Sequence, residues 1–389
     1  MKKKIIIQLI SIIALAAILT VLVINVIKLT NQNAQTTETR RPEMMGGPGE
    51  ESTEKDTKAE DVESGQEVTE SNINLSKYDT NITITKEGEY TLTGIFENCV
   101  LINTNGAVTL NLNGVTIENE TTAVIANIGT GELVINIVDG TENKLSDGGS
   151  SEYDACIYSV GKLTITGNGK LSVYGNQTEG EGIATETNDI TINSGNIYIE
   201  SNDDGINAGG DGGTITINDG EIYIKANGDG IDSNQNLIIN GGTIYAMGSA
   251  QGGDSGIDTD DGFEINGGTI IALGSDMLET PEKTSTQNTI CFTLDETISE
   301  GTNIALLDEN DNVTISFKAN ETFKTLIISS EKLTNGTYKL YKNGINTGTL
   351  TNGLYAEGNY TKGTEISVSN NTEFIINSTI TTIGTTGRQ

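Results

Sequence analysis

The residues best suited to chemistry are aspartates that recur around a Gly-Ile pair in three successive segments. They stand just before the glycine or just after the isoleucine. The candidate metal ligands are Asp203, Asp204, Asp229, Asp232, Asp254, Asp258 and Asp260. Carboxylates are preferred ligands of Ca²⁺, which takes about six to eight oxygens. The pattern therefore predicts calcium bound at these turns.

The spacing of these acids makes a cation necessary if the segments stack. Neighbouring strands lie about 4.8 Å apart. Two carboxylates at that distance repel by roughly 3–4 kcal/mol at an effective dielectric constant of about 20. Lys225 is the one base nearby, so ion pairs within the chain cannot neutralise the group. The alternative is a solvated acidic rim without a metal ion.

A second set of residues repeats with the same period. The predicted ligand-binding residues are Tyr198, Tyr223 and Tyr245, which share one outward position in three consecutive segments. Tyrosine rings combine an apolar face with a hydroxyl group, and both suit a sugar ring. Alternatively, the three rings form an apolar patch that lies under the C-terminal part of the chain.

Composition excludes several classes of function. The chain has no histidine, which excludes His-based triads and His metal sites. The net charge of −32 argues against nucleic acid and anionic membranes as electrostatic partners and favours cations. The cysteines Cys99, Cys156 and Cys291 match no metal or redox spacing and are interpreted as buried apolar residues. A Cys99–Cys156 disulfide stays open as an alternative.

An internal repeat positions both sets of residues. Residues 189–199, 214–224, 236–246 and 262–272 align, and their glycines Gly195, Gly220, Gly242 and Gly268 mark a unit of 22–26 residues. Each half of a unit alternates apolar and polar residues, as strands do. Stacked strand units bury a continuous interior that one unit cannot bury alone. The sequence predicts an all-β fold, a right-handed parallel β-helix of about seven coils between residues 82 and 280.

Two further features belong to this prediction. The recurring Asn193, Asn218, Asn240 and Asn266 are expected to form a ladder in which each amide bonds to the next coil. After Pro281 the repeat stops, and alternating strands with Asn-Gly turns at 335–336, 343–344 and 352–353 indicate hairpins. We expect a small antiparallel β module over residues 288–380 that packs on or caps the helix, whose own domain spans residues 73–280.

The N-terminal segment predicts export. Three lysines precede an apolar run from Ile5 to Ile27, about as long as a membrane-spanning helix. Residues 1–29 are interpreted as an uncleaved anchor that leaves the rest on the extracellular face, with a cleaved signal and secretion as the alternative. Residues 30–72 are polar, lack periodicity and are predicted to be a disordered linker.

Several blocks resemble a known family. Residues 88–94, 108–117 and 140–148, together with the Asp-Gly-Ile repeats, resemble bacterial carbohydrate-binding β-helix proteins of pectate-lyase-like architecture, founded on a clostridial cell-surface protein. The resemblance covers roughly residues 75–380. It implies Ca²⁺ bound at the coils and affinity for acidic plant polysaccharide such as polygalacturonate, without cleavage.

Catalysis is not expected. Eliminative cleavage of pectate uses calcium with an arginine or lysine base, and the only arginines, Arg40, Arg41 and Arg388, lie outside the repeats. Asp203-Asp204 could suggest a carboxylate pair for glycoside hydrolysis, but repetition over three coils is more typical of metal binding. We therefore predict no catalytic residue. A polysaccharide-degrading enzyme and a structural adhesin remain as alternatives.

Overall fold

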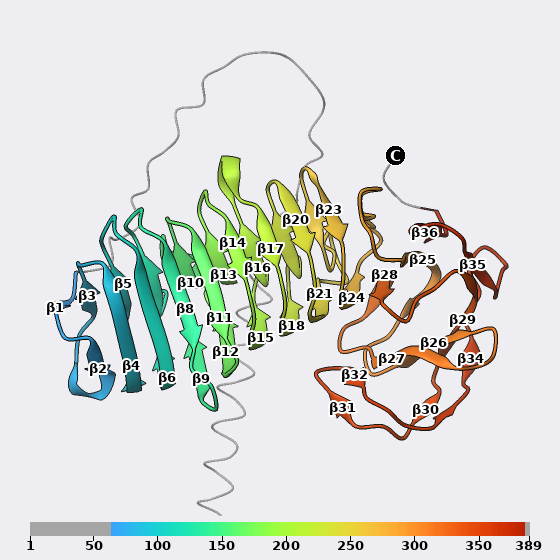
Figure 1. Cartoon of the computed structure of the whole chain (residues 1–389), viewed down its shortest axis with the longest axis horizontal. Coiled ribbons are helices and arrows are strands. Elements are labelled where there is room, and N and C mark those ends of the chain that lie inside the picture. The colour runs from blue at the N-terminus through green and yellow to red at the C-terminus, as the bar shows by residue number, and fades with distance from the viewer. Residues whose placement is uncertain (1–63, 386–389) are drawn as a thin grey trace, which may run out of the picture. The chain divides into compact units, whose positions relative to one another are not determined.

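The computed structural model describes residues 64–385. The predicted anchor (1–29) and most of the predicted linker (30–72) lie outside this range, so both stay predictions. None of the helices formed by residues 64–385 is long and apolar enough to cross a membrane. The described chain is almost entirely β-structure, in a solenoid of about seven turns followed by a C-terminal module (Figure 1).

The solenoid is built from two long walls of parallel strands. The first wall, called sheet A here, has nine strands, which follow one another along the solenoid in chain order. Its strands are β1 (Gln66–Val68), β3 (Ile82–Ile84), β5 (Val100–Ile102), β7 (Ile125–Asn127), β10 (Ala155–Ser159), β13 (Glu181–Thr185), β16 (Ile206–Ala208), β19 (Ile231–Ser233) and β22 (Asp258–Thr259).

The second wall, called sheet B here, takes one or two strands from each coil. The solenoid strands of sheet B are β2 (Asn72–Asn74), β4 (Gly88–Phe96), β6 (Val108–Glu118), β8 (Leu133–Ile137), β9 (Glu142–Ser146), β11 (Leu163–Gly167), β12 (Lys170–Gly175), β14 (Ile190–Ile192), β15 (Asn196–Ser201), β17 (Ile215–Ile217), β18 (Glu221–Ala226), β20 (Asn236–Ile239), β21 (Thr243–Met247), β23 (Gly262–Ile265) and β24 (Thr269–Gly274). Short 3₁₀ turns occur at Leu75–Lys77 and Gly210–Gly212.

The alternation in the sequence sets which side chains fill the interior. In β14, Ile190 and Ile192 are buried while Thr191 between them is partly exposed. In β15, Ile197 and Ile199 point inward and Tyr198 points outward. Since the strands stack in register, with Ile190 opposite Ile215, each isoleucine lies on the isoleucine of the next coil. The prediction of a continuous apolar interior is confirmed.

The asparagine ladder is also confirmed. The Asn218 amide donates to Asn193 Oδ1 at 2.8 Å, and Asn240 donates to Asn218 Oδ1 at 2.9 Å. Asn266 continues the ladder at 3.4 Å from Asn240 Oδ1. Each amide thus uses its donor on one side and its acceptor on the other, which holds the turns of consecutive coils together.

The C-terminal module continues sheet B and then folds into a sheet of its own. Its strand β28 (Phe323–Ser330) pairs antiparallel with β24, the last solenoid strand of sheet B, and with β25 (Thr289–Ile298). This pairing covers an edge that would otherwise expose unpaired backbone groups, so the module caps the solenoid as predicted. The other strands are β26 (Asn303–Asp308), β27 (Val313–Lys318), β29 (Gly336–Lys342), β30 (Ile345–Asn346), β31 (Leu350–Thr351), β32 (Leu354–Tyr355), β33 (Tyr360–Thr361), β34 (Thr364–Glu365), β35 (Phe374–Ile376) and β36 (Ile380–Ile383).

Some predicted details of the module were wrong. Of the three Asn-Gly pairs, only Asn352-Gly353 closes a two-residue hairpin, between β31 and β32, with φ of 46° and 77°. The other two pairs join strands that are not hydrogen-bonded to each other. Strand β28 pairs with solenoid strand β24, β29 pairs with β26, and β30 pairs with β33. In addition, β36 runs parallel to β25, so the module is not purely antiparallel.

Two smaller expectations are also decided. Strand β1 begins at Gln66, so the solenoid starts earlier than the predicted boundary at residue 73, and the predicted linker is shorter at its end. Cys99, Cys156 and Cys291 are free and buried, which confirms their interpretation as apolar residues and excludes the Cys99–Cys156 disulfide in this structure.

Candidate functional site

The repeated acids gather on the outer side of sheet A. Asn207 in β16 lies opposite Asp232 in β19, and Asp232 lies opposite Asp258 in β22, so these three form one row across three coils. A second row lies at the turns that lead into the same strands. There, the Gly182 N–H donates to the carbonyl of Asp204 and the Gly205 N–H donates to that of Asp229, both at 2.9 Å.

The second row extends one coil further back, to Glu181. Both rows together are called the acidic face, which consists of Glu181, Asp204, Asn207, Asp229, Asp232 and Asp258. Asn207 connects the two rows, since its amide nitrogen donates to Glu181 Oε1 at 2.5 Å and to Asp204 Oδ2 at 3.3 Å. The glycine after each turn acid is required by packing, because a Cβ at Gly205 would lie 2.1 Å from Ile224 Cγ2.

Two of these carboxylates have one oxygen bound to the next coil. Asp204 Oδ1 accepts the backbone N–H of Asp229 at 2.6 Å, and Asp229 Oδ1 accepts the backbone N–H of Ser255. Hydrogen bonds between a carboxylate and backbone N–H groups are charge-assisted and strong. Asp204 and Asp229 therefore fasten the turns, while Oδ2 of Asp204 accepts the Asn207 amide.

Burial makes the charged form of these groups costly. It raises the pKa of Glu181 to about 9, and the charges of Asp154 and Asp204 add to the effect. It raises the pKa of Asp229 to about 8 and that of Asp204 to about 7, again with repulsion from neighbouring carboxylates. For Asp232, burial and the Asp258 charge raise the pKa to about 6. At neutral pH the face therefore holds closely spaced carboxyl groups that a nearby cation would stabilise.

The described chain supplies no such cation. Among residues 64–385, no lysine or arginine forms an ion pair with a member of the acidic face. Asn207 Oδ1 is also buried and accepts no hydrogen bond. An all-oxygen set of desolvated carboxylates with a buried, unpartnered amide oxygen fits a hard cation such as Ca²⁺.

The acids do not form a compact metal centre as they stand. Within the part of the chain that the structure describes, no three His, Cys, Asp or Glu side chains converge into a group that could hold a metal ion. The seven aspartates predicted as ligands are spread over three coils, and only Asp204, Asp229, Asp232 and Asp258 belong to the two rows. Asp203 and Asp254 lie outside the rows but within electrostatic range of each other, while burial raises the pKa of both. Asp260 is exposed, and its charge contributes to the raised pKa of Asp232. A bound ion would need amide or carbonyl oxygens besides carboxylates.

Sequence reasoning missed Glu181. The signal was present, because Glu181-Gly182-Ile183 repeats the pattern of Asp204-Gly205-Ile206 with the longer acid in place of aspartate. Glu181 is the member of the acidic face whose pKa lies highest. It also lines a cavity of about 240 Å³ with Tyr158, Asn207 and Glu186.

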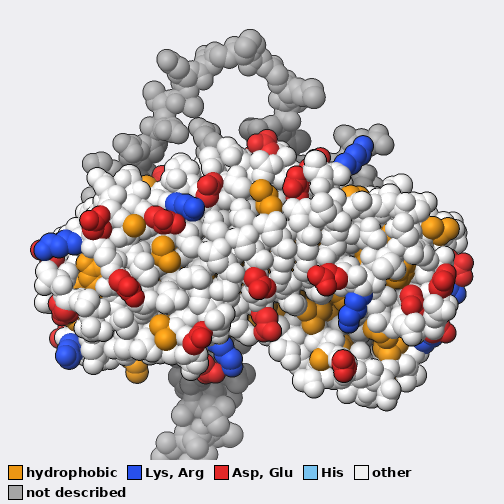
Figure 2. Space-filling view, in the orientation of Figure 1, with side chains coloured by type: hydrophobic (Ala, Val, Ile, Leu, Met, Phe, Trp, Pro, Cys, Tyr) orange, Lys and Arg blue, Asp and Glu red, His pale blue; other side chains and the backbone are white. Residues whose placement is uncertain are grey.

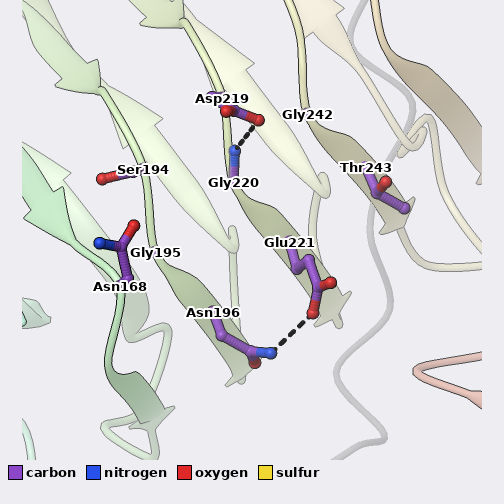
Figure 3. Close-up of a pocket in the computed structure, with 9 residues that line it drawn as sticks. All are labelled: Asn168, Ser194, Gly195, Asn196, Asp219, Gly220, Glu221, Gly242 and Thr243. Carbon is purple, nitrogen blue, oxygen red and sulfur yellow. Dashed lines mark hydrogen bonds between the residues drawn. The ribbon is translucent and has the colours of Figure 1, made fainter. Parts of the chain in front are cut away.

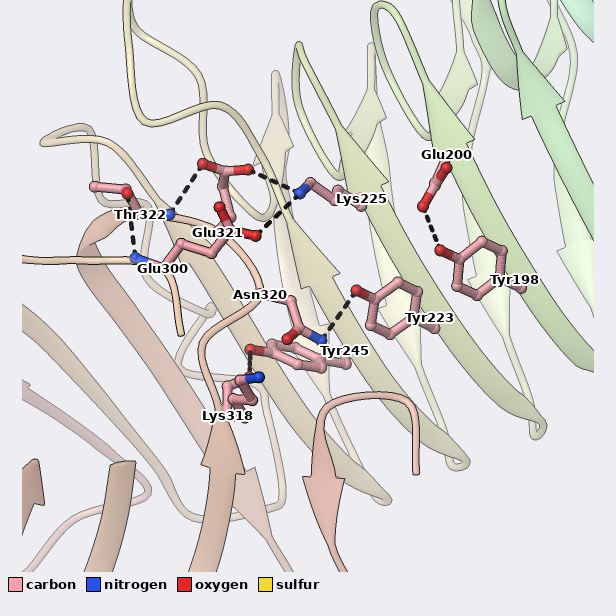
Figure 4. A network of polar contacts seen from close by, with 10 residues as sticks. All are labelled: Tyr198, Glu200, Tyr223, Lys225, Tyr245, Glu300, Lys318, Asn320, Glu321 and Thr322. Atoms are coloured by element: carbon pink, nitrogen blue, oxygen red, sulfur yellow. Dashed lines mark hydrogen bonds and ion pairs between the residues drawn. The ribbon is translucent and has the colours of Figure 1, made fainter. Parts of the chain in front are cut away.

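The predicted tyrosine surface is mostly covered. Tyr198 and Tyr223 stack with ring centres 4.9 Å apart, and Tyr223 and Tyr245 meet edge to face at 5.7 Å. Tyr245 is buried and its hydroxyl donates to the carbonyl of Lys318, while the Tyr223 hydroxyl accepts from the Asn320 amide (Figure 4). Tyr223 and Tyr245 therefore bind the C-terminal module, and their prediction as ligand-binding residues is corrected. Tyr198 alone keeps a partly exposed ring.

Lys225 lies with the tyrosines, away from the acidic face. Its ammonium group is 3.4 Å from Glu321 Oε2 and 3.6 Å from Glu300 Oε1, two carboxylates of the module (Figure 4). The tyrosine row lies on sheet B and the acidic face on sheet A. The two predicted sites thus lie on different walls of the solenoid.

Comparison with known proteins identifies the family of the chain. The profile of a family described as carbohydrate-binding domain-containing protein matches residues 78–337, about two thirds of the chain. The chain belongs to this carbohydrate-binding family. The match includes the solenoid from β3 onward, the acidic face and the first strands of the C-terminal module.

Two individual proteins are similar over shorter stretches. A carbohydrate-binding domain-containing protein of Acetivibrio thermocellus is 33% identical over 158 residues, which are 38% of this chain and 54% of that protein. The chain thus spans about half the length of this curated relative. A solved structure of a polysaccharide lyase-like protein from C. thermocellum is 29% identical in sequence, with a TM-score of 0.40. The match covers 47% of this chain and 84% of the chain of that protein.

Proposed function

We propose that the protein is a non-catalytic receptor for acidic polysaccharide, which it binds through calcium held on the acidic face. The observation that carries this proposal is the set of buried carboxylates on three coils without a counter-cation from the described chain. Membership of a carbohydrate-binding family supplies the class of ligand. Display at the cell surface through residues 1–29, or secretion if they are cleaved, is part of the proposal.

The charges of the chain explain why a cation is needed. With a net charge of −32, the protein repels polygalacturonate unless positive charge lies between them. Asp232 and Asp258 point outward from sheet A, and Asn207 offers its free Oδ1 beside Asp204. Calcium bound there would supply positive charge and open coordination positions for uronate carboxylates.

The proposal includes no cleavage. The only arginines lie outside residues 64–385. Lys225 lies on sheet B, away from the acidic face, and is paired with Glu300 and Glu321 of the C-terminal module. To test this, polygalacturonate is incubated with the protein and calcium. The absorbance of unsaturated products and the number of new reducing ends are then measured. Sustained release of either product would show that the protein is an enzyme and would refute a non-catalytic receptor.

Binding is tested on the full chain by pull-down on insoluble uronan, in calcium and in excess chelator. We expect binding only in calcium, and at least a tenfold loss in the double variant Asp232→Asn/Asp258→Asn. The matched control is Asp79→Asn/Glu97→Gln, which removes two exposed charges in the first coils and should bind like the parent protein. Equal uronan binding with and without chelator would refute the calcium bridge. Absence of binding to any polysaccharide would favour an adhesin that recognises protein.

A further inference from the structure

A cleft lies between the last coils of the solenoid and the C-terminal module. It has a volume of about 740 Å³, within the range of small-molecule sites. Its floor includes Thr243 and Thr269, which lie opposite each other on β21 and β24. Its other side is formed by β27 and by the segment around Tyr355.

The cleft is held open by fixed contacts. Gly353, at the tip of the β31–β32 hairpin, lies so close to the Tyr245 ring that an added Cβ would be 2.0 Å from Cε1. Tyr245 itself is hydrogen-bonded to Lys318. The Tyr355 hydroxyl donates to Asn303 Oδ1 at 2.9 Å, which fixes the position of a half-buried ring at the cleft wall. The lining is therefore built by packing between solenoid and module.

A shallower trough continues from the cleft along the solenoid. It has a volume of about 540 Å³ and follows the glycine turns of three coils, and Thr243 lines both cavities (Figure 3). Asn196, Glu221, Thr243 and Thr269 form one row in register along this path. Coils about 4.8 Å apart give this row a length of about 14 Å. Such a path suits an extended chain molecule.

The charges of the path do not suit an acidic ligand. In the cleft, Asp311 is paired with Lys362, and the remaining charged lining residues are Lys332 and Glu357, one of each sign. In the trough, Asp219 and Glu221 are carboxylates, and Glu221 accepts from the Asn196 amide at 2.7 Å. Acidic side chains are scattered over the solenoid face in Figure 2 as well. A uronate chain would be repelled along the trough, whereas sugar hydroxyls can donate to these carboxylates.

Hydroxyl groups are available to a ligand inside the cleft. Those of Thr243, Thr269 and Thr314 make no hydrogen bond within residues 64–385. Together with the Tyr355 ring they provide polar contacts and one apolar surface, which is the combination that sugar rings require. We propose that the trough and the cleft form one binding path for an uncharged polysaccharide, separate from the acidic face. This site goes beyond the proposed function and does not depend on it.

The test is affinity electrophoresis of the full chain through gels that contain xyloglucan, galactomannan or mixed-linkage β-glucan. We expect at least one of these uncharged polysaccharides to retard the protein, equally in calcium and in chelator. Tyr355→Ala should weaken the retardation at least fivefold. Thr243→Phe, which places a ring where trough and cleft meet, should abolish it. The matched control is Thr216→Phe, at an outward position of β17 that lines neither cavity.

The outcomes separate the two sites. Uronan binding in calcium should be unchanged in Tyr355→Ala and Thr243→Phe. Both variants should also unfold cooperatively in urea like the parent protein, which shows that they are folded whether or not uronan binds. The inference is overturned if none of the three polysaccharides retards the parent protein, or if Thr243→Phe is retarded like Thr216→Phe. It is also overturned if chelator abolishes the retardation, since the acidic face would then bind the uncharged glycan as well.

Discussion

In excess chelator, the free energy of unfolding of the protein should fall as the pH rises from about 5 to about 7. Asp229 has a pKa of about 8 in the folded protein, while an aspartate in an unfolded chain has a pKa of about 3.9. Between these values the folded state holds a proton that the unfolded state has released. Each pH unit then costs about 1.4 kcal/mol, so Asp229 alone lowers the free energy of unfolding by about 3 kcal/mol over this interval. The loss ends once the pH passes the folded pKa.

The assay is urea unfolding of chelated protein at both pH values. In Asp229→Asn the dependence on pH should be shallower, and the new amide oxygen can still accept the Ser255 N–H that Asp229 binds. Asp219→Asn, a change at an exposed aspartate on the other wall, should keep the dependence of the parent protein. Millimolar calcium should restore stability at the higher pH, because a metal ion binds the deprotonated carboxylates.

The opposite sign would refute this reasoning. If chelated protein is more stable at about pH 7 than at about pH 5, the acidic face is not desolvated as its contacts indicate. An unchanged pH dependence in Asp229→Asn would assign the effect to other groups. Full recovery with magnesium in place of calcium would contradict a large, flexible oxygen site, because Mg²⁺ requires near-octahedral geometry.

Three further predictions concern the packing. Tyr245→Ala removes a buried ring and its bond to Lys318, so it should destabilise the protein by about 3–5 kcal/mol in urea unfolding, whereas Tyr198→Ala should cost about 1 kcal/mol. Gly353→Ala should lower the melting temperature by several degrees, because its φ is 77° and the new Cβ would meet Tyr245; an unchanged value would show that the hairpin tip moves freely. Cys99 and Cys291 should not react with a thiol reagent until the protein unfolds, because burial raises the pKa of both to about 12; rapid labelling of native protein would contradict this.

The solenoid could be predicted because its contacts repeat with the sequence. Residues one repeat apart, such as Ile190 and Ile215, become neighbours in adjacent coils. A local alternation of apolar and polar residues therefore determines the whole interior. The asparagine ladder follows for the same reason, since Asn193 and Asn218 hold one position in consecutive repeats.

The acidic face was predictable in part. Asp232 and Asp258 lie opposite each other because the repeat places them in register. Glu181 belongs to the same face, but it was missed because the other repeats have aspartate at this position and Glu181 is a glutamate. The sequence could not tell that Asp204 and Asp229 each bind a backbone N–H of the following coil, because that bond depends on how tightly the turns stack.

The sequence by itself determined the β-solenoid, the rows of identical side chains and the cap, all of which follow from a short period and local alternation. The tertiary structure decided what covers each row. Tyr245 bonds to Lys318 and Tyr223 to Asn320, pairs separated by 73 and 97 residues with no shared repeat. Lys225 likewise pairs with glutamates of the module. Such contacts join two segments with different patterns, and neither pattern specifies the other, so only the folded chain shows that one predicted surface is buried and that a cleft opens beside it.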